Sequence, residues 1–432
     1  MTGKFQTIIL IVFIVAAVFG ILVFSGAIPI GDGDAPGALG VVVLWGTIDS
    51  GAILPVLAEF NDANPAFILR YEEKSPETFD QDLLEALAES KGPDLFFLPD
   101  NLAYRYQSKI LAVPYENFSV ASFKKSFAEG GEVFLTSRGI LALPIFIDPL
   151  VMYYNRSILD ASAIASPPAY WDEVLQMVPV LTQKDGSNTL RRSAVALGQF
   201  SNIAHAKEIL STLFMQVGNP IVAEENGAFL SALNESTYKY NLPSVLKFYT
   251  SFADPLASTY SWNRSFASSS DAFSSENLAF YFGFASELKS LINKNPNQNF
   301  LPAPFPQLKN AKFKLSAARM TGLAISQFSK NLNGAATAAT RLANGDFAGK
   351  LAMSLGVVPA RRDLLSAPPA DAYSSIFYSS ALYSRSWLDP SPKDTNNIFR
   401  TLIERVLSNS MSPDSALADA DAKLNLLLTK NR

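Results

Sequence analysis

The residue types that most often carry out chemistry are scarce in this chain. It contains no cysteine and a single histidine, His205, which excludes cysteine nucleophiles and zinc sites built from cysteine and histidine. His205 lies in SNIAHAKEILSTLF, where the apolar residues keep helical spacing, so we predict a helix-surface histidine rather than a catalytic base. Glu72 and Glu73 are neighbours on a predicted strand and point to opposite faces, so they do not form the carboxylate pair of a glycosidase. The sequence therefore predicts no catalytic residue, no metal site and no cofactor.

Composition favours contact with small molecules over contact with polyanions. The chain has 432 residues, which exceeds what one hydrophobic core usually supports, so two globular units are expected. Its 31 Phe, 15 Tyr and 4 Trp supply an unusual number of aromatic faces for ligand contact. The net charge of -4 gives no basic footprint for nucleic acid or anionic lipid.

The N-terminal region is long and apolar enough to reach across a membrane. The run from Ile8 to Ile28 is uncharged, and about 20 helical residues span ~30 Å of hydrocarbon. We predict a signal anchor or transmembrane helix over residues 1–30, with a cleaved signal peptide ending at Ser25 to Ala27 as the alternative. Lys4 on its N-terminal side predicts export of the rest of the chain, which a flexible linker over 31–40 would tether.

From residue 41 onward, strand and helix patterns alternate. Three segments are predicted strands, in the order VVVLW, FILRYEE and DLFFL. The segments between them, SGAILPVLAEF and the residues after Ser75-Pro76, have helical periodicity. This β-α-β-α-β order predicts a mostly parallel sheet covered by helices, which binds ligands beyond the carboxyl ends of its strands. The residues predicted there run from Trp45 to Asp49 and from Pro99 to Asn101, and Asp49 is also a candidate helix cap.

The segment GILALPIFIDPLVMYYNRSILD, residues 139–160, raises a separate question. It has the composition of a strand, yet Pro144 and Pro149 cannot donate to a sheet ladder. We therefore predict that pairing breaks within this segment.

Several fragments in a fixed order resemble one family. They are VVVLWG, LAEFNDANPAF, GPDLFFL, LAVP, GILALPIFIDPLVMYYNRSIL and PPAYWDEV, followed by LPAPFPQ, TGLAISQFSKNLNGAATAATRLA and LGVVPARRDLL. In this order, the chain resembles the bacterial extracellular solute-binding proteins, the sugar-type receptors of ABC importers related to maltose-binding protein. The resemblance covers roughly residues 41–432 and leaves out the N-terminal run.

The resemblance implies an α/β fold of two lobes, the type II periplasmic-binding-protein fold, with a mixed, mostly parallel sheet in each lobe. Residues 41–148 would form the first part of lobe one and 149–318 the first part of lobe two. Residues 319–366 would return to lobe one, and 367–432 would complete lobe two. In such receptors the segment around Asp148 crosses the hinge, which would explain its two prolines.

The same resemblance implies where a solute would bind. Trp45 is the leading candidate because a flat indole suits the apolar face of a pyranose. Carboxylates and amides at the cleft could bond sugar hydroxyls. The full set of predicted ligand contacts is Trp45, Asp49, Asp100, Asn101, Asp148, Tyr153, Trp262, Phe282, Gly283 and Trp387. The turn Phe282-Gly283-Phe284 lacks the tryptophan that the family commonly has there.

The implied function is that of a monomeric extracytoplasmic receptor, bound to the membrane by its N-terminal helix, that delivers a solute to the permease subunits of an ABC importer. A carbohydrate is the favoured solute. A membrane-anchored binding module for a polyamine, a peptide or a surface polymer stays open as an alternative, since one fold serves many ligands. A glycan-active enzyme is a less favoured alternative, because the sequence nominates no carboxylate pair. An acidic cleft would favour polyamines and an aromatic cleft would favour glycans.

Overall fold

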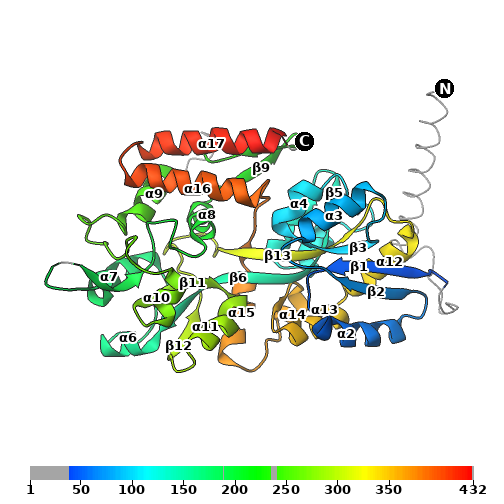
Figure 1. Ribbon diagram of the computed structural model, residues 1–432, viewed down its shortest axis with the longest axis horizontal. Coiled ribbons are helices and arrows are strands. Elements are labelled where there is room, and N and C mark those ends of the chain that lie inside the picture. Colours follow the sequence, from blue (N-terminus) through cyan, green and yellow to red (C-terminus); the bar gives the residue numbers. More distant parts are fainter. Residues whose placement is uncertain (1–37, 188, 235–240, 431–432) are drawn as a thin grey trace.

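The computed structural model describes residues 38–187, 189–234 and 241–430. The predicted membrane segment, Ile8 to Ile28, lies outside these ranges. Among the described residues, no helix has both the length and the apolar character needed to cross a membrane. The described chain forms an elongated body with two halves (Figure 1).

The first half is built on the predicted β-α-β-α-β unit. It consists of β1 (Val41–Gly46), α2 (Ser50–Ala63), β2 (Ile68–Glu73), α3 (Phe79–Ala88) and β3 (Leu95–Pro99). Strand β1 pairs in parallel with both β2 and β3, so the predicted alternation is confirmed. Asp49 caps α2 through a hydrogen bond from the Ala52 amide, and the helix ends at Asn64.

Two long strands, β6 (Leu143–Asn155) and β13 (Ser316–Ile325), run through both halves. In Figure 1 they form the bridge at the centre of the molecule. Strand β6 is continuous, so the predicted interruption of the strand is wrong. The predicted end of ladder pairing is present at Pro149 as a change of partner: Pro149 lies opposite Ala318 on β13, whereas Leu150 lies opposite Phe284 on β11 (Leu278–Phe284).

Pro144 is accommodated by an irregularity in the same ladder. It lies opposite Gly322, where the register between β6 and β13 shifts. A proline that cannot donate is tolerated at such a bulge. The predicted lobe boundaries at 148 and 318 therefore fall inside continuous strands, and these boundaries stay predictions.

The second half has a mixed sheet in which antiparallel pairs predominate. Strand β11 pairs in parallel with β8 (Leu190–Val195), whereas β6 pairs antiparallel with β11 and with β12 (Phe300–Ala303), and β7 (Gln183–Lys184) pairs antiparallel with β8. The expected predominance of parallel pairing holds for β1 to β3 only. The single sheet that results runs in the order β2-β1-β3-β13-β6-β11-β8-β7 through both halves.

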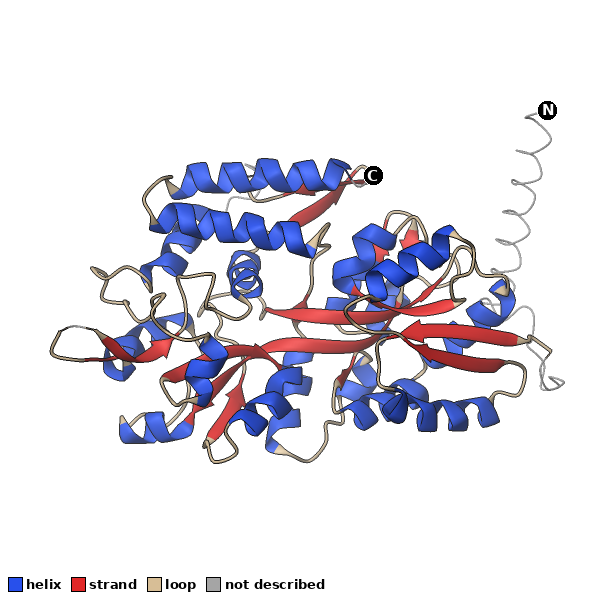
Figure 2. Ribbon diagram, in the orientation of Figure 1, coloured by secondary structure: helices blue, strands red, loops and turns tan. Residues whose placement is uncertain are grey.

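Helices cover both faces of this sheet (Figure 2). The remaining elements around the first half are α4 (Asp100–Tyr106), α5 (Val120–Ser126), η1 (Glu129–Phe134), β4 (Leu135–Thr136), β5 (Gly139–Ile140), α12 (Leu332–Leu342), α13 (Gly345–Leu355), β14 (Val358–Pro359) and α14 (Arg362–Leu365). Those around the second half are α6 (Arg156–Ala161), α7 (Trp171–Leu181), α8 (Ala206–Gln216), β9 (Val222–Glu225), β10 (Ala228–Ser231), α9 (Leu242–Ser251), α10 (Ser269–Ser274), η2 (Ala285–Glu287), α11 (Leu288–Lys294), α15 (Ala372–Ala381), β15 (Ser384–Arg385), α16 (Pro392–Leu407) and α17 (Pro413–Lys430).

Candidate functional site

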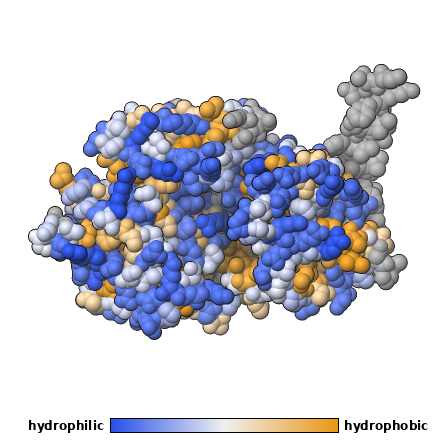
Figure 3. Space-filling view, viewed as in Figure 1, coloured by the Kyte–Doolittle hydropathy of each residue, from blue (hydrophilic) through white to orange (hydrophobic). Residues whose placement is uncertain are grey.

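Three adjoining cavities meet at one residue, Arg319 on β13. The cavities measure about 640, 280 and 360 Å³, and the Arg319 side chain lines all three of them. We call these cavities together the crevice. Figure 3 shows a furrow between the two halves of the molecule, on a face that is otherwise mostly polar.

The 360 Å³ cavity combines hydrogen-bonding groups with one indole. Asp100 and Asn101 line it from the start of α4, and Trp387 lines it from the segment between β15 and α16. Ser211 on α8 also lines it, and this side chain is fully buried with no hydrogen-bond partner for its Oγ atom among the described residues. A buried hydroxyl of this kind lacks the partner that native structures normally supply. The Ser211 Oγ atom has almost no accessible surface, so a ligand in the cavity would reach it only after its neighbours move.

The 280 Å³ cavity is more apolar. Its walls include Ile48 beyond β1, Phe97 on β3 and Phe146 on β6. Asp148 supplies a carboxylate and Ser286 a hydroxyl from opposite halves. The two are hydrogen-bonded: the Ser286 amide and hydroxyl donate to the two carboxylate oxygens of Asp148 at 2.9 and 2.7 Å.

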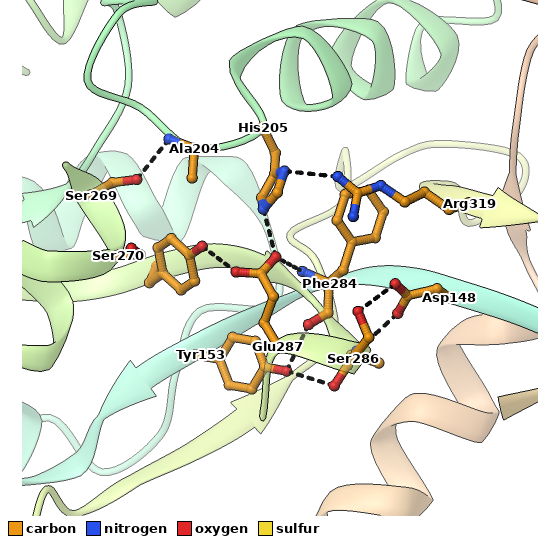
Figure 4. A network of polar contacts seen from close by, with 12 residues as sticks. Asp148, Tyr153, Ala204, His205, Ser269, Ser270, Phe284, Ser286, Glu287 and Arg319 are labelled. Carbon is orange, nitrogen blue, oxygen red and sulfur yellow. Dashed lines mark hydrogen bonds and ion pairs between the residues drawn. The ribbon is translucent and has the colours of Figure 1, made fainter. Parts of the chain in front are cut away.

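A polar network surrounds Arg319 (Figure 4). Its guanidinium lies over the ring of Phe284, 3.8 Å from the centroid, and its Nη2 atom is 3.3 Å from Nδ1 of His205. Nε2 of His205 lies 2.5 Å from a carboxylate oxygen of Glu287. Glu287 also accepts hydrogen bonds from the Tyr281 hydroxyl and the Phe284 amide. The network joins β13, α8, η2 and β11 at the wall of the crevice.

Burial alters the acidity of the two crevice aspartates. It raises the pKa of Asp100 to about 6, although hydrogen bonds from Ser386 and the Met320 and Asn101 amides act in the opposite direction. Burial also raises the pKa of Asp148, against the lowering effect of its two bonds from Ser286. Perturbed carboxyl groups gathered in one cleft are typical of functional sites.

Four of the predicted ligand contacts lie at the crevice. Asp100, Asn101 and Trp387 line the 360 Å³ cavity, and Asp148 lines the 280 Å³ cavity. They come from segments far apart in sequence, and the strands β3, β6 and β13 bring them together. Their contact with a ligand stays a prediction.

Trp45, the leading candidate, does not line the crevice. The side chain belongs to a hydrophobic core that extends through both halves, and it is 8% exposed. The ammonium of Lys74 lies 3.7 Å from the centroid of its ring, so one face of the indole is covered. Asp49 also lies outside the cavities, where it serves as the cap of α2.

The remaining four candidates are packed inside the second half. Tyr153 is buried and donates its hydroxyl to the carbonyl of Phe284. Trp262 is fully buried and stacks on Phe266, and Phe282 packs against Trp171. Gly283 is next to the Tyr281 ring, where a Cβ would approach to 2.5 Å. Each of these residues has a structural explanation that needs no ligand.

Sequence reasoning missed Arg319 and His205. Arg319 carries a single charge within the otherwise uncharged strand SAARMTGLAI, and this is the signal that could have revealed it. The prediction of a helix-surface histidine is wrong, because His205 precedes α8 in the left-handed conformation (φ 59°) and its side chain is 16% exposed.

A sheet shared by two halves, with a polar crevice where strands cross between them, defines the class of two-lobed solute-binding proteins. The model of the family described as bacterial extracellular solute-binding protein matches residues 56–377. The chain therefore belongs to this family, as its sequence resemblance indicated. A search of curated protein sequences gives no match.

Solved structures share the fold at low sequence identity. The cyclic α-maltosyl-1,6-maltose-binding protein from Arthrobacter globiformis has a TM-score of 0.72 at 14% identity, covering 90% of this chain and 99% of its own. A cyclo/maltodextrin-binding protein complexed with maltotetraose has a TM-score of 0.71 at 17% identity, covering 91% and 98%. An ABC substrate-binding protein from Listeria monocytogenes, in complex with cycloalternan, has a TM-score of 0.64 at 14% identity, covering 90% and 98%. These likenesses establish the two-lobed fold.

Proposed function

We propose that this protein is an extracytoplasmic receptor that captures a sugar or oligosaccharide in the crevice and delivers it to an ABC permease. The observation that carries the proposal is the crevice itself, in which Arg319, Asp100 and Asp148 gather at the strands that join the halves. Sugars present many hydroxyl groups, and planar guanidinium and carboxylate groups bond them at defined angles. Family membership and the sugar ligands named for similarly folded proteins support the same conclusion.

A polyamine is the main alternative solute, and the charges of the crevice argue against it. Five carboxylates line the three cavities, those of Asp100, Asp148, Glu208, Asp389 and Glu404, and they are accompanied by the cations Lys207, Arg319, Arg385 and Arg400. A polycation would be repelled by Arg319, which no carboxylate neutralises at ion-pair distance within the described chain. Mixed charge with an indole at one wall suits a neutral polyhydroxylated ligand better.

Calorimetric titration of the purified protein with maltotetraose, mannobiose, spermidine and a tetrapeptide tests this assignment. We expect one of the two saccharides to bind with micromolar or tighter affinity, about -8 kcal/mol or more favourable. The Arg319→Met variant should weaken that binding, whereas Arg156→Met should not, since Arg156 is an exposed residue of α6. Binding of spermidine alone would contradict the sugar assignment and leave the receptor class intact.

Attachment through residues 1–30 and delivery to a permease form the second part of the proposal. The apolar run from Ile8 to Ile28 supports an anchor, and the family supports an extracytoplasmic position for the rest. Carbonate washing of membranes and protease treatment of intact cells test it. Retention in the membrane pellet together with sensitivity to external protease is expected, and release of a product beginning near residue 28 would contradict the anchor.

A further inference from the structure

Arg319 has an unusual environment for a charged residue at the centre of a ligand site. No carboxylate lies within ion-pair distance of it among the described residues, and its two close contacts are the Phe284 ring and Nδ1 of His205. The side chain lines all three cavities of the crevice. Whatever fixes its position therefore also determines which hydrogen bonds a ligand meets.

The partners of His205 define its hydrogen-bonding state. Glu287 offers only acceptor oxygens at Nε2, so Nε2 carries a proton and donates it. Arg319 offers only donors, so Nδ1 must be without a proton to accept from it. The arrangement fits one form of the imidazole, the neutral tautomer with its proton on Nε2.

Glu287 is itself held firmly in the carboxylate form. Burial alone would raise its pKa, but hydrogen bonds from His205 and Tyr281, together with one from a backbone amide, hold the pKa below its ordinary value. The His205 ring is also fixed edge-on against the Phe284 ring at 4.8 Å. The imidazole is therefore oriented from two sides, and it presents the Nδ1 lone pair to the guanidinium.

We propose that His205, oriented by Glu287, is a positioning residue that holds Arg319 for the ligand, and that protonation of His205 releases Arg319 and weakens capture. The proposal rests on the function proposed above. Protonated His205 would turn an N–H group and a positive charge toward a guanidinium 3.3 Å away, so an attraction becomes a repulsion.

Other ionisable groups face this network and must be separated from it. The cavity that His205 lines also has Lys207, Glu208, Arg319, Arg400 and Glu404 in its walls, from α8, β13 and α16. Glu287, Tyr281 and Asp148 face the network from η2, β11 and β6. Asp100, which also lies at the crevice, ionises near pH 6 because burial raises its pKa to about 6. An Asp100→Asn variant removes that contribution.

The first test needs no ligand. His205 is the only histidine of the chain, so its imidazole nitrogens give unambiguous ¹⁵N signals in the full-length protein. We expect the Nε2–H tautomer at pH 8 and, in Arg319→Met, a midpoint of protonation higher by about 1 pH unit, because a neighbouring cation has been removed. The exposed Arg156→Met variant should leave the midpoint unchanged. An Nδ1–H tautomer, or an unchanged midpoint in Arg319→Met, would overturn the proposal.

The second test measures capture, with maltotetraose as the probe or mannobiose if that binds more tightly. Between pH 8 and pH 5 we expect a loss of affinity of about 10-fold in the Asp100→Asn background. Adding His205→Asn should abolish this dependence, since asparagine tolerates the left-handed backbone of residue 205 but does not titrate. A dependence that persists in the double variant would overturn the proposal. Absence of binding by either saccharide at any pH would instead contradict the sugar assignment, while the tautomer measurement still decides the role of His205.

Discussion

Trp387 and Trp171 show how two residues of one type differ through their surroundings. Trp387 lines the crevice and stacks on Phe399 with the rings 6.3 Å apart. Trp171 begins α7, is 4% exposed, and donates its indole N–H to Gln216 at 2.9 Å. The first residue can lose solvent contact to a ligand, whereas the second is already part of the core.

Replacing each tryptophan by alanine should therefore separate binding from stability. Trp387→Ala should weaken saccharide binding by roughly 10- to 100-fold, or about 1.4 to 2.8 kcal/mol. Trp171→Ala should leave affinity unchanged and lower the free energy of unfolding by roughly 3 to 5 kcal/mol. Calorimetric titration and chemical denaturation of both variants provide the measurement. Equal affinity in Trp387→Ala and the parent would exclude Trp387 as a ligand contact.

Asp100 should make the stability of the protein depend on pH. Burial raises its pKa to about 6 in the folded state, whereas the unfolded chain binds the same proton only near pH ~4. Between these values the folded state carries the extra proton, so the contribution of Asp100 to stability rises as pH falls from 7 toward 4. The gain should be on the order of 1 to 3 kcal/mol.

Denaturation curves from pH 4 to pH 8 for the parent and Asp100→Asn test this sign. As the pH falls, the free energy of unfolding of the parent should increase relative to that of Asp100→Asn. Asp160→Asn serves as the control, because Asp160 is an exposed carboxylate on α6. If the free energies of unfolding of the parent and Asp100→Asn change with pH in the same way, Asp100 does not cause the pH dependence.

At the scale of the elements, two roles were predicted for Asp49, the residue before helix α2. Asp49 was expected both to cap the helix and to contact the ligand, and the structure shows the cap. Asp49→Ala should lower stability by about 1 kcal/mol through loss of that hydrogen bond. Saccharide affinity should be unchanged, and Asp49→Asn, which retains an acceptor oxygen, should restore most of the stability. A tenfold loss of affinity in both variants would return Asp49 to the list of contacts.

Local elements could be predicted from the sequence, because their periodicity is a property of short segments. The first-half unit from β1 to β3 follows from alternating strand and helix patterns and from caps such as Asp49 and Asn64. The continuity of β6 could not be predicted. It depends on pairing with β13 and β11, whose residues lie far along the chain, and on a bulge that accommodates Pro144.

The site was only partly predictable for the same reason. Asp100 and Asn101 follow a strand end, a position that sequence patterns reveal. The Trp45 ring is contacted by Lys74, which follows β2, and the role of His205 depends on Glu287 and Arg319. Such tertiary contacts leave no periodic signal in a single sequence.

At the scale of the whole molecule, the two halves are joined by strands rather than by a flexible linker. Strands β6 and β13 pass continuously between them, and the partner of β6 changes from β13 to β11 between Pro149 and Leu150. This geometry favours rotation of the halves about the centre of the sheet, as in hinged binding proteins.

Closure around a ligand is therefore the last prediction. Saturating maltotetraose, or mannobiose if it binds more tightly, should reduce the radius of gyration measured by small-angle scattering, because the two halves approach each other across the crevice. The saccharide that fails to bind provides the control for solvent effects. Arg319→Met should need more ligand to reach the closed state, whereas Trp171→Phe should behave like the parent. If calorimetry confirms saturation and the radius of gyration stays the same, the halves do not close, and the crevice must bind its ligand as a preformed site.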